Sequence, residues 1–258
     1  MKFLDLNCQK GYQSGLGKFL QTVLKQKSYD VLILQEVTDN VLSYLNDPSY
    51  ECLRAFNKEI NAENELCIVY RKSFILERWG FESFAALRKD PVRGFKHPCF
   101  GLLWADLKTE AGMMRVASIH AHSGTDQKVR IEEVRRTKEV LCKQTARPTI
   151  IAGDFNAGFF HEPDEIAQAF FPEFIWETKK LEPTLDSRYS ENVPHLPNRI
   201  AALLSLFNIG IHLRTDHVFL DHNLALDITP SFLILPDRIS DHSPIECLID
   251  FNKKNLGK

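Results

Sequence analysis

The sequence predicts an α+β fold whose helices and strands form α/β/β/α layers. Several apolar runs of strand length, rich in β-branched residues, are separated by polar stretches or by Pro and Gly. Amphipathic helical patterns lie between some of these runs, which indicates a strand–helix–strand opening followed by mainly hairpin-like strands. The 258 residues contain no repeat, low-complexity tract or Gly/Ser linker, so we expect a single domain over residues 1–258.

The predicted strands are short apolar runs bounded by polar or turn-forming residues. Runs of this length are too short for membrane helices, and their β-branched content favours strands over helices. In chain order they cover residues 1–7, 30–35, 65–71, 100–107, 115–120, 148–152, 215–220 and 244–251.

The predicted helices follow the first strand and the later ones. Apolar residues recur at i, i+3 and i+4 over 16–24, and a weaker stripe covers 131–141. Residues 164–171 and 199–206 are shorter candidates. The irregular stretch 182–198 contains three prolines, and a loop of this length in a compact domain is usually functional.

The composition excludes several classes of protein. With 34 acidic against 32 basic residues, the net charge of −2 argues against nucleic-acid binding by bulk charge, although a local basic patch stays compatible with it. Asp5 and Asn7 interrupt the first apolar run, so a secretory signal is not expected. The six cysteines form no CxxC pair, which favours reduced thiols over a zinc ribbon or three disulfides. We expect a cytoplasmic monomer without a transmembrane segment.

Five of the buried runs have polar side chains at their tips. These tips are Gln35-Glu36, His120-Ala121-His122, Asp154-Phe155-Asn156, Asp216-His217 and Ser240-Asp241-His242. Strands often begin and end with polar residues for no functional reason. Five tips that repeat carboxylate, amide and imidazole groups favour one polar site at a common sheet edge.

The residue types at these tips suit phosphoryl chemistry. Glu36, Asp154 and Asp241 offer hard oxygen ligands, with Asn7 and Asn156 as neutral partners, and this set suits Mg²⁺ or Mn²⁺ better than zinc. Such an ion neutralises phosphate oxygens, while a histidine with a near-neutral pKa deprotonates the attacking water. The sequence contains neither a GxSxG nucleophile elbow nor the GK[ST] of a nucleotide-binding loop.

Several of these segments match motifs of a known family, in the same order. Leu34-Gln35-Glu36-Val37, Gly153-Asp154-Phe155-Asn156 and Ser240-Asp241-His242 resemble the QE, GDFN and SDH motifs of the endonuclease/exonuclease/phosphatase superfamily. Residues 6–8, 118–120, 183–185 and 215–219 resemble its remaining segments. The superfamily includes apurinic endonucleases, pancreatic-type deoxyribonucleases, neutral sphingomyelinases and inositol polyphosphate phosphatases. The resemblance implies a four-layer α/β/β/α sandwich of two mainly antiparallel sheets flanked by helices.

The resemblance also implies a role for each matched position. Metal ligands would be Asn7, Glu36 and Asp241, and catalytic residues would be His120, Asp154, Asn156, Asp216 and His242. In these roles Glu36 and Asn7 hold Mg²⁺ or Mn²⁺ against the phosphate. Asp216 orients His242, which is the general base or transition-state partner. Asp154 positions the nucleophilic water, Asn156 binds a phosphate oxygen and His120 contacts the scissile phosphate.

Two positions depart from the family pattern. His217 stands where the family usually has Tyr, and His120-Ala121-His122 offers two histidines where one is expected. Because alternate residues of a strand share a face, either histidine is compatible with the site. We prefer His120 by its place in the motif. Arg130 opens the next predicted helix, where either a functional role or a salt bridge at the helix start would explain it.

The predicted function is metal-dependent hydrolysis of a phosphate ester, with a phosphodiesterase or nuclease as the first candidate. The expected partner is a phosphate-ester substrate, and nucleic acid is one candidate. The charged residues of the loops 57–64 and 182–198 are mainly acidic, which weakens the case for duplex DNA. The alternative is a phosphodiesterase or phosphatase for small molecules or lipid headgroups. A catalytically silent scaffold is the remote alternative, because Glu36, Asp154 and His242 are all present.

Overall fold

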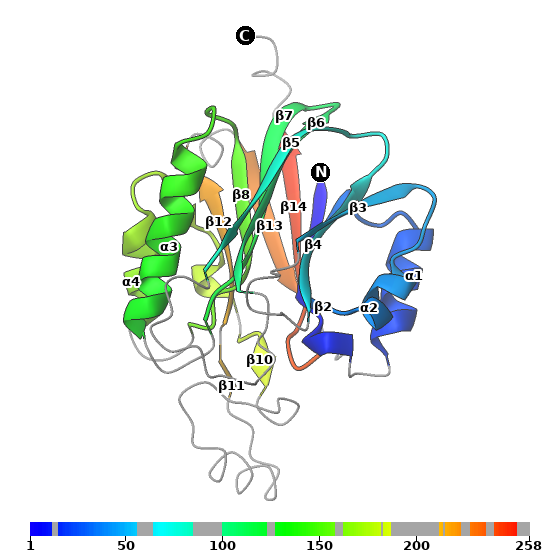
Figure 1. The fold of residues 1–258 in the computed structure, drawn as a ribbon, viewed down its shortest axis with the longest axis horizontal. Coiled ribbons are helices and arrows are strands. Elements are labelled where there is room, and N and C mark those ends of the chain that lie inside the picture. The colour runs from blue at the N-terminus through cyan, green and yellow to red at the C-terminus, as the bar shows by residue number, and fades with distance from the viewer. Residues whose placement is uncertain are drawn as a thin grey trace, which may run out of the picture.

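The structure is a computed structural model, and it is an α/β/β/α sandwich (Figure 1). It describes residues 1–11, 15–55, 64–84, 100–122, 127–157, 162–181, 183–186, 212–213, 215–222, 228–235 and 240–251. Two six-stranded sheets face each other, with one pair of helices on the outer face of each. The predicted four-layer fold class is therefore confirmed.

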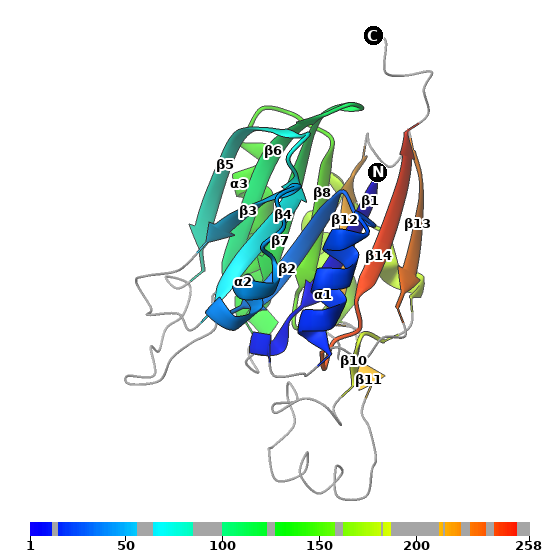
Figure 2. The same cartoon turned by 90° about the vertical axis from the view of Figure 1, so that its right-hand side faces the viewer.

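The first sheet is built mainly from the two ends of the chain. Its strands, in spatial order, are β13 (Ile228–Ile234), β14 (Ile245–Phe251), β1 (Lys2–Asn7), β2 (Val31–Val37), β4 (Glu65–Arg71) and β3 (Tyr50–Ala55). Neighbours are antiparallel except β1 and β2, which are parallel and are joined through the helix α1 (Leu16–Lys25). Figure 2 shows α1 and the short helix α2 (Asp39–Tyr44) in front of this sheet.

The second sheet is built from the middle of the chain. In spatial order its strands are β5 (Ile75–Ser83), β6 (Gly101–Thr109), β7 (Gly112–His120), β8 (Thr149–Asp154), β12 (Asp216–Asp221) and β9 (Phe174–Trp176). Its parallel pair is β7 and β8, joined through α3 (Gln127–Cys142). This helix and α4 (Glu162–Phe170) cover the outer face (Figure 1). Smaller elements are η1 (Gln9–Gly11), η4 (Thr178–Lys180), β10 (Leu185–Asp186) and β11 (His212–Leu213).

Three apolar clusters hold the layers together, and strand alternation assigns each residue to one of them. On β1, Phe3 points into the space between the sheets, whereas Leu4 and Leu6 point outward to α1. On β7, Val116 points inward and Ile119 points outward to α3 and α4. Each sheet is thus buried on both faces, which explains why the central strands are nearly continuous apolar runs.

All eight predicted strands and three of the predicted helices are present, with ends shifted by a few residues. The predicted helix 199–206 and most of the loop 182–198 lie outside the described residues. The sequence analysis missed β3, β5, β9, β13 and α2. Of these, β5 is an edge strand with mostly solvent-facing side chains, and β13 contains Pro230, which only an edge strand tolerates well. Within the described part of the chain, no helix is long and apolar enough to cross a membrane.

A buried arginine ties the second sheet to α3. Arg115 on β7 is 1% exposed, and it donates two hydrogen bonds to Asp106 on β6, of 2.7 and 3.1 Å. Two further N–H groups donate to the carbonyl of Leu141 in the last turn of α3 and to that of Thr145 just after this helix, at 3.2 Å each. A buried ion pair of this kind is stable because nearly all of its donors and acceptors are satisfied.

Loss of this arginine should destabilise the protein strongly. We expect Arg115→Met to lower the free energy of unfolding by about 3–5 kcal/mol, because a buried Asp106 carboxylate loses its main partner. The matched control is Arg78→Met, since Arg78 also donates to Asp106 but is 44% exposed; it should cost less than about 1 kcal/mol. Urea denaturation measures both values, and equal losses would contradict the assignment.

Candidate active site

The inner faces of both sheets turn from apolar to polar at one end of the sandwich. Along β1 the inward side chains are Phe3, Asp5 and Asn7, and along β8 they end in Asp154. Residues two apart share a face, so each inner column continues from the apolar core into the site without a loop between them. The site therefore lies on rigid strand ends, next to β10 (Figure 1).

Strand register brings three of the predicted residues into one row across the second sheet. His120 on β7 is directly opposite Asp154 on β8, and Asp154 is directly opposite Asp216 on β12. All three are at most 2% exposed. The end of the parallel pair β7–β8 and the start of the antiparallel strand β12 meet at the same edge, as the sequence analysis expected for these tips.

Glu36 reaches the site through an irregularity in β2. The pairing of β2 with β4 shifts between Leu34 and Val37, and Glu36 has a φ of 52°. In a regular strand Gln35 and Glu36 would point to opposite faces, whereas the bulge lets both serve the inner face. The Oε1 atom of Glu36 lies 3.8 Å from Nε2 of His120.

Asp154 lies at the centre of the predicted residues. Asn7 donates from Nδ2 to its Oδ2 at 2.9 Å, and the backbone N–H of Asn156 donates to its Oδ1 at 2.8 Å. The Nε2 atoms of His120 and His242 lie 3.7 and 3.9 Å from its Oδ2. The bond from Asn7 crosses from the first sheet to the second, so it fixes the relative position of the two sheets at the site.

The backbone around Asp154 is as constrained as its side chain. Gly153 has a φ of 144°, and a Cβ at this position would lie 2.1 Å from the carbonyl oxygen of Ile119. Only glycine fits both conditions. Asn156 has a φ of 51°, and its Nδ2 donates to the carbonyl of Ala121 at 2.9 Å. The constraint on the GDFN segment is thus steric at Gly153 and polar at Asp154 and Asn156.

His242 and Asp216 form a buried pair. Nδ1 of His242 donates to Oδ2 of Asp216 at 2.8 Å, and this contact leaves Nε2 facing Asp154 and Asp241, at 3.9 Å from each. Thr215 donates from Oγ1 to the same Asp216 oxygen at 3.2 Å. The tautomer and orientation of the imidazole are therefore set by Asp216.

Thr184 and Gln9 support this pair from neighbouring segments. The Oγ1 atom of Thr184 accepts hydrogen bonds from the backbone N–H groups of Thr215 and Asp216, at 3.3 and 3.2 Å. The Oε1 atom of Gln9 accepts one from the N–H of Asp241 at 3.3 Å. The sequence analysis quoted Thr184 within a motif but gave it no role, and it did not single out Gln9. A buried Thr in a loop and a Gln at φ 43° carry no specific signal in the sequence.

The charges within the site determine the protonation of the pair. Burial opposes the charged form of His242, but Asp216, Asp241 and Asp154 together raise its pKa well above its ordinary value of 6.5. Burial likewise opposes ionisation of Asp216, but the His242 charge and its hydrogen bond lower the pKa of that carboxyl below 3.8. At neutral pH the pair is an imidazolium beside a carboxylate.

The other carboxyl groups are crowded and only partly compensated. Burial, and then repulsion from Asp241, raise the pKa of Glu36 to about 7, although Lys10 and a hydrogen bond from Asn7 lower it in part. Burial is also the main cause that raises the pKa of Asp154 to about 7, with His242 opposing it. Carboxylates that gain protons at neutral pH indicate an excess of negative charge that a cation would relieve.

These residues fit a hard divalent cation. Asp154, Asp216 and His242 offer ligand atoms that all lie within 4.8 Å of one another, and the predicted ligand Glu36 lies beside Asn7, with Asp241 acting on its charge. Carboxylate and amide oxygens are the ligands that Mg²⁺ and Mn²⁺ prefer. Asp216 already forms an ion pair with His242. Glu36 and Asp241 repel each other, so they are the carboxylates whose negative charge a cation would offset.

The structure separates the two histidines of the β7 tip. His120 contacts Glu36 and Asp154, as described above, and its ring packs 4.9 Å from that of Phe100. His122 packs edge-on against Phe100 at 5.4 Å, and its backbone N–H donates to Glu133. The geometry supports the preference for His120. Arg130, fully buried, donates to the carbonyl of His122, so it supports this segment from α3.

His217 does not belong to the row of site residues. It follows Asp216 on β12 and points to the outer face, where its ring packs between Phe155 and Trp176 at 5.6 and 5.1 Å. Its Nε2 lies 3.1 Å from the carbonyl oxygen of Ala157. The departure from the family's Tyr therefore affects the packing behind the site rather than the site's own donors.

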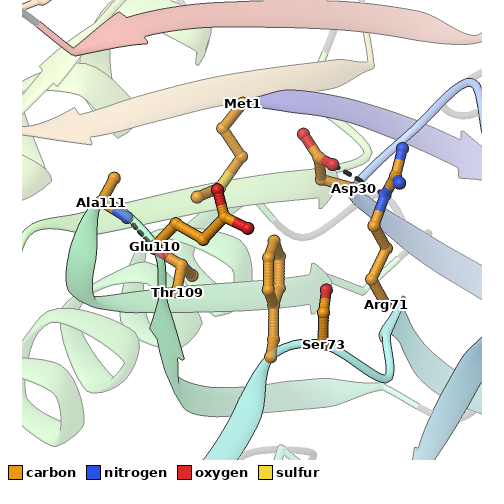
Figure 3. A pocket seen from close by; sticks show the side chains of 8 residues that line it. Met1, Asp30, Arg71, Ser73, Thr109, Glu110 and Ala111 are labelled. Atoms are coloured by element: carbon orange, nitrogen blue, oxygen red, sulfur yellow. Dashed lines mark hydrogen bonds and ion pairs between the residues drawn. The ribbon is translucent and has the colours of Figure 1, made fainter.

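A pocket of about 300 Å³ lies at the other end of the sandwich (Figure 3). Its walls include the start of β1 at Met1 and the turn between β6 and β7 at Glu110. Figure 3 shows Asp30 and Arg71 paired at one side, with 2.8 Å between Oδ1 and Nε. Asp30 and Arg71 thus neutralise each other's charge in the wall of the pocket. The pocket lies at the start of β1 and is separate from the site at the end of this strand.

The chain is an α/β/β/α sandwich with a buried polar site at one end of its two sheets. The model of the endonuclease/exonuclease/phosphatase family matches residues 6–242, and the chain belongs to this family. The match extends from the strand that carries Asn7 to His242 itself. The comparison with curated proteins gives no significant match.

Solved structures of family members have the same fold at low sequence identity. The structure of D. rerio TDP2 complexed with a single-strand DNA product is 18% identical and covers 97% of this chain and 98% of its own, with a TM-score of 0.72. The mannosyl-6-phosphatase of Bacteroides thetaiotaomicron VPI-5482 is 17% identical and covers 97% and 100%, with a TM-score of 0.68. A truncated Caenorhabditis elegans TDP2 is 16% identical and covers 97% of each chain, with a TM-score of 0.68.

Removing the Glu36 charge should stabilise the metal-free protein. At pH 8 Glu36 is ionised in both the folded and unfolded states, and its raised folded pKa makes that charge unfavourable in the fold. We expect Glu36→Gln to raise the free energy of unfolding by about 1–3 kcal/mol. The gain should shrink as the pH falls from 7 towards 4.5, because the folded wild type then takes up its proton first.

Chemical denaturation with a chelator present, at pH 8 and pH 5, measures this effect. Glu77→Gln on β5 is the matched control, because Glu77 is exposed and should change the stability little at either pH. A loss of stability in Glu36→Gln at pH 8 would contradict the crowding of carboxylates at the site.

Proposed function

We propose that the protein is a divalent-metal-dependent phosphodiesterase in which an activated water attacks phosphorus in line. The observation that carries the proposal is the His242–Asp216 pair, whose Nε2 faces Asp154 at 3.9 Å between the two sheets. The His242 imidazole, which is a buried proton donor, and the buried Asp154 carboxylate then face the same small volume from different sides. This arrangement suits a group that gains negative charge during the reaction, as a phosphoryl group does.

Asp154 is the group we assign to the water. Its pKa of about 7 in the metal-free site lets it accept a proton near neutral pH. Asn7 and the N–H of Asn156 hold one oxygen each, so the carboxylate cannot rotate away. A water held by this carboxylate would attack on the side of the phosphate that faces the second sheet.

His242 is assigned to the phosphoryl oxygens rather than to the water. The neighbouring carboxylates raise its pKa well above 6.5, which favours a protonated ring in the metal-free site and suits a proton donor better than a base. Asp216 holds the Nδ1 proton, which leaves the Nε2 proton for an oxygen of the transition state. Of the two roles that the resemblance implied for His242, the structure supports that of transition-state partner.

Glu36, Asn7 and Asp241 are the residues that we propose to hold the cation, with Mg²⁺ or Mn²⁺ as the expected ion. When bound, such an ion neutralises phosphate oxygens and acts as a Lewis acid. These proposed ligands would come from β1 and β2 of the first sheet and from the segment before β14. His120 lies between Glu36 and Asp154, within 3.8 Å of both, and would contact the phosphate there.

Hydrolysis of a small phosphate monoester is the second candidate. One structural relative is a mannosyl-6-phosphatase and another is bound to a single-strand DNA product, so this fold accommodates both kinds of substrate in other proteins. The acidic composition of residues 57–64 and 182–198 favours a small substrate over duplex DNA. The retained site argues against a silent scaffold. The single domain, the cytoplasmic location and the monomeric state stay predictions.

Substitutions of the histidines should separate catalysis from packing. We expect His242→Gln to lower kcat/KM by about 100-fold or more, and His120→Gln to lower it by about tenfold or more, because both lose a donor to the phosphate. His122→Gln is the matched control and should stay within about threefold. Steady-state kinetics with bis-p-nitrophenyl phosphate and Mg²⁺ measure these values. Loss of activity in His122→Gln but not in His120→Gln would reverse the assignment.

A substrate panel tests the function itself. Each of bis-p-nitrophenyl phosphate, single-stranded DNA, abasic duplex DNA, RNA, sphingomyelin and a sugar 6-phosphate is incubated with Mg²⁺, with Mn²⁺ or with a chelator. We expect hydrolysis of at least one diester only when the metal is present, and its absence in Asp154→Asn. Turnover of the monoester alone would favour the second candidate. Turnover that persists with the chelator would contradict the metal-dependent mechanism.

A further inference from the structure

A layer of three polar side chains lies between the two sheets, directly beneath the candidate active site. Its members are Asp5 on β1, Gln35 on β2 and Ser118 on β7, and each of them is at most 3% exposed. The inward residues two positions earlier on these strands belong to the apolar core: Phe3, Ile33 and Val116. The layer is therefore the first polar step out of that core.

Each member of the layer is followed on its own strand by a residue of the site. Two of them lie two positions before the site residue, which is Asn7 on β1 and His120 on β7. On β2 the bulge brings Glu36, the residue directly after Gln35, to the inner face. A contact within the layer can therefore act on the site through one or two bonds of the backbone.

The amide of Gln35 joins the two sheets. Its Nε2 donates to Oδ1 of Asp5 at 3.0 Å and to Oγ of Ser118 at 3.2 Å. Asp5 belongs to the neighbouring strand of the same sheet, whereas Ser118 belongs to the opposite sheet. An amide nitrogen carries two hydrogens, and both are used here. The side chain cannot turn without losing a buried hydrogen bond.

The backbone next to this amide is held at the point where it departs from a regular strand. The carbonyl oxygen of Gln35 accepts a hydrogen bond from the N–H of Cys8 at 2.9 Å. Glu36 follows with a φ of 52°, and such a conformation persists only where the surrounding contacts determine it. Gln35 supplies these contacts before Glu36, and the buried Val37, paired with Glu65, supplies them after it.

Packing alone does not account for an amide at this position. Oε1 of Gln35 accepts no hydrogen bond from any described residue, although the side chain is fully buried. A buried acceptor without a partner is destabilising, and a leucine or methionine of similar size would avoid that penalty. The amide nitrogen, which links the two sheets, is the part of the side chain that an apolar residue could not replace.

We propose that Gln35 is a positioning residue, whose hydrogen bond to Ser118 across the sheets holds Glu36 in the conformation that binds the divalent cation. The inference rests on the proposed function, because it takes Glu36 as a ligand of that cation. Gln35 is fully buried and acts only through its neighbour. The 3.8 Å between Glu36 Oε1 and His120 Nε2 spans the two sheets, so a bond between the strands beside these residues helps to maintain it.

The first experiment measures cation binding without substrate. Free Mn²⁺ gives an electron paramagnetic resonance signal that weakens on binding, so a titration of the full-length protein gives the dissociation constant for Mn²⁺. We expect Gln35→Leu to raise this constant about tenfold, as is typical when a partner that orients a metal ligand is lost. Ser118→Ala should raise it about fivefold, the equivalent of one net hydrogen bond. Urea denaturation shows whether each variant is folded; if Gln35→Leu is not, Ser118→Ala and its control carry the test.

Two comparisons separate positioning from a general loss of stability. Thr137→Val is the matched control, because it removes another fully buried hydroxyl, which donates to the carbonyl of Glu133 within α3. It should leave the dissociation constant unchanged. In the double variant Gln35→Leu/Ser118→Ala we expect the same rise of about tenfold as in Gln35→Leu alone, because one bond cannot be lost twice. A rise of about fiftyfold would show two independent effects and would overturn the proposal.

The second experiment measures hydrolysis of bis-p-nitrophenyl phosphate as a function of the Mg²⁺ concentration. We expect Gln35→Leu to need about tenfold more Mg²⁺ for half-maximal activity, with kcat at saturating Mg²⁺ within about threefold of the wild type. A lower kcat with an unchanged Mg²⁺ requirement would show a structural role alone and would contradict the positioning of Glu36.

The same titrations distinguish this inference from the proposed function. Glu36→Gln should lose most of the Mn²⁺ affinity, because it replaces a charged ligand by a neutral one. If Glu36→Gln weakens binding while Gln35→Leu and Ser118→Ala bind as the wild type does, the positioning role is wrong and the proposed cation site stands. If Glu36→Gln binds Mn²⁺ as tightly as the wild type, the proposed cation site is wrong and the inference falls with it.

Discussion

The dry space between the two sheets is the constraint on which the rest of the structure depends. Most inward side chains of the central strands lose their contact with water, so a buried polar group is tolerated there only when the protein supplies its partner. Towards the start of β1 the space is filled by apolar side chains such as Phe3 and Val116. Towards its end Asn7 bonds to Asp154, and Asp216 bonds to His242. The site is the part of the core where polar pairing replaces apolar packing.

This pairing is incomplete, because burial raises the pKa values of Glu36 and Asp154 to about 7 even though some of their oxygens are hydrogen-bonded. Between the sheets, Gln35 donates to both Asp5 and Ser118, at 3.0 and 3.2 Å, so a layer of hydrogen-bonded polar side chains, with the Asp5 carboxyl group among them, lies between the apolar core and the site. Beyond that layer the acidic groups outnumber their cationic partners. Crowded carboxylates of this kind are destabilising in the absence of a counter-charge, and protein sites often accept such a cost in stability in exchange for function.

The sequence was sufficient to predict the layers and the polar residues that the fold brings together at one sheet edge, because both follow from alternation and from motifs at strand tips. It could not show how Glu36 reaches the inner face, since a bulge after Leu34 depends on pairing with β4, which is distant in the chain. It gave no role to Thr184, whose hydrogen bonds to the β12 backbone exist only in the folded state. It missed β5, because an edge strand with exposed side chains lacks the apolar pattern that marks a core strand.

The bond between Asn7 and Asp154 joins residues that are 147 positions apart, from different sheets. In the first sheet, β14 lies near the end of the described chain and pairs with β1, which lies at the beginning of the chain. The amide, the carboxylate and the imidazole of His242 therefore come together only after both sheets have formed and docked. Assembly of the candidate site is in this sense a test of the whole fold: neither sheet alone contains all of its residues.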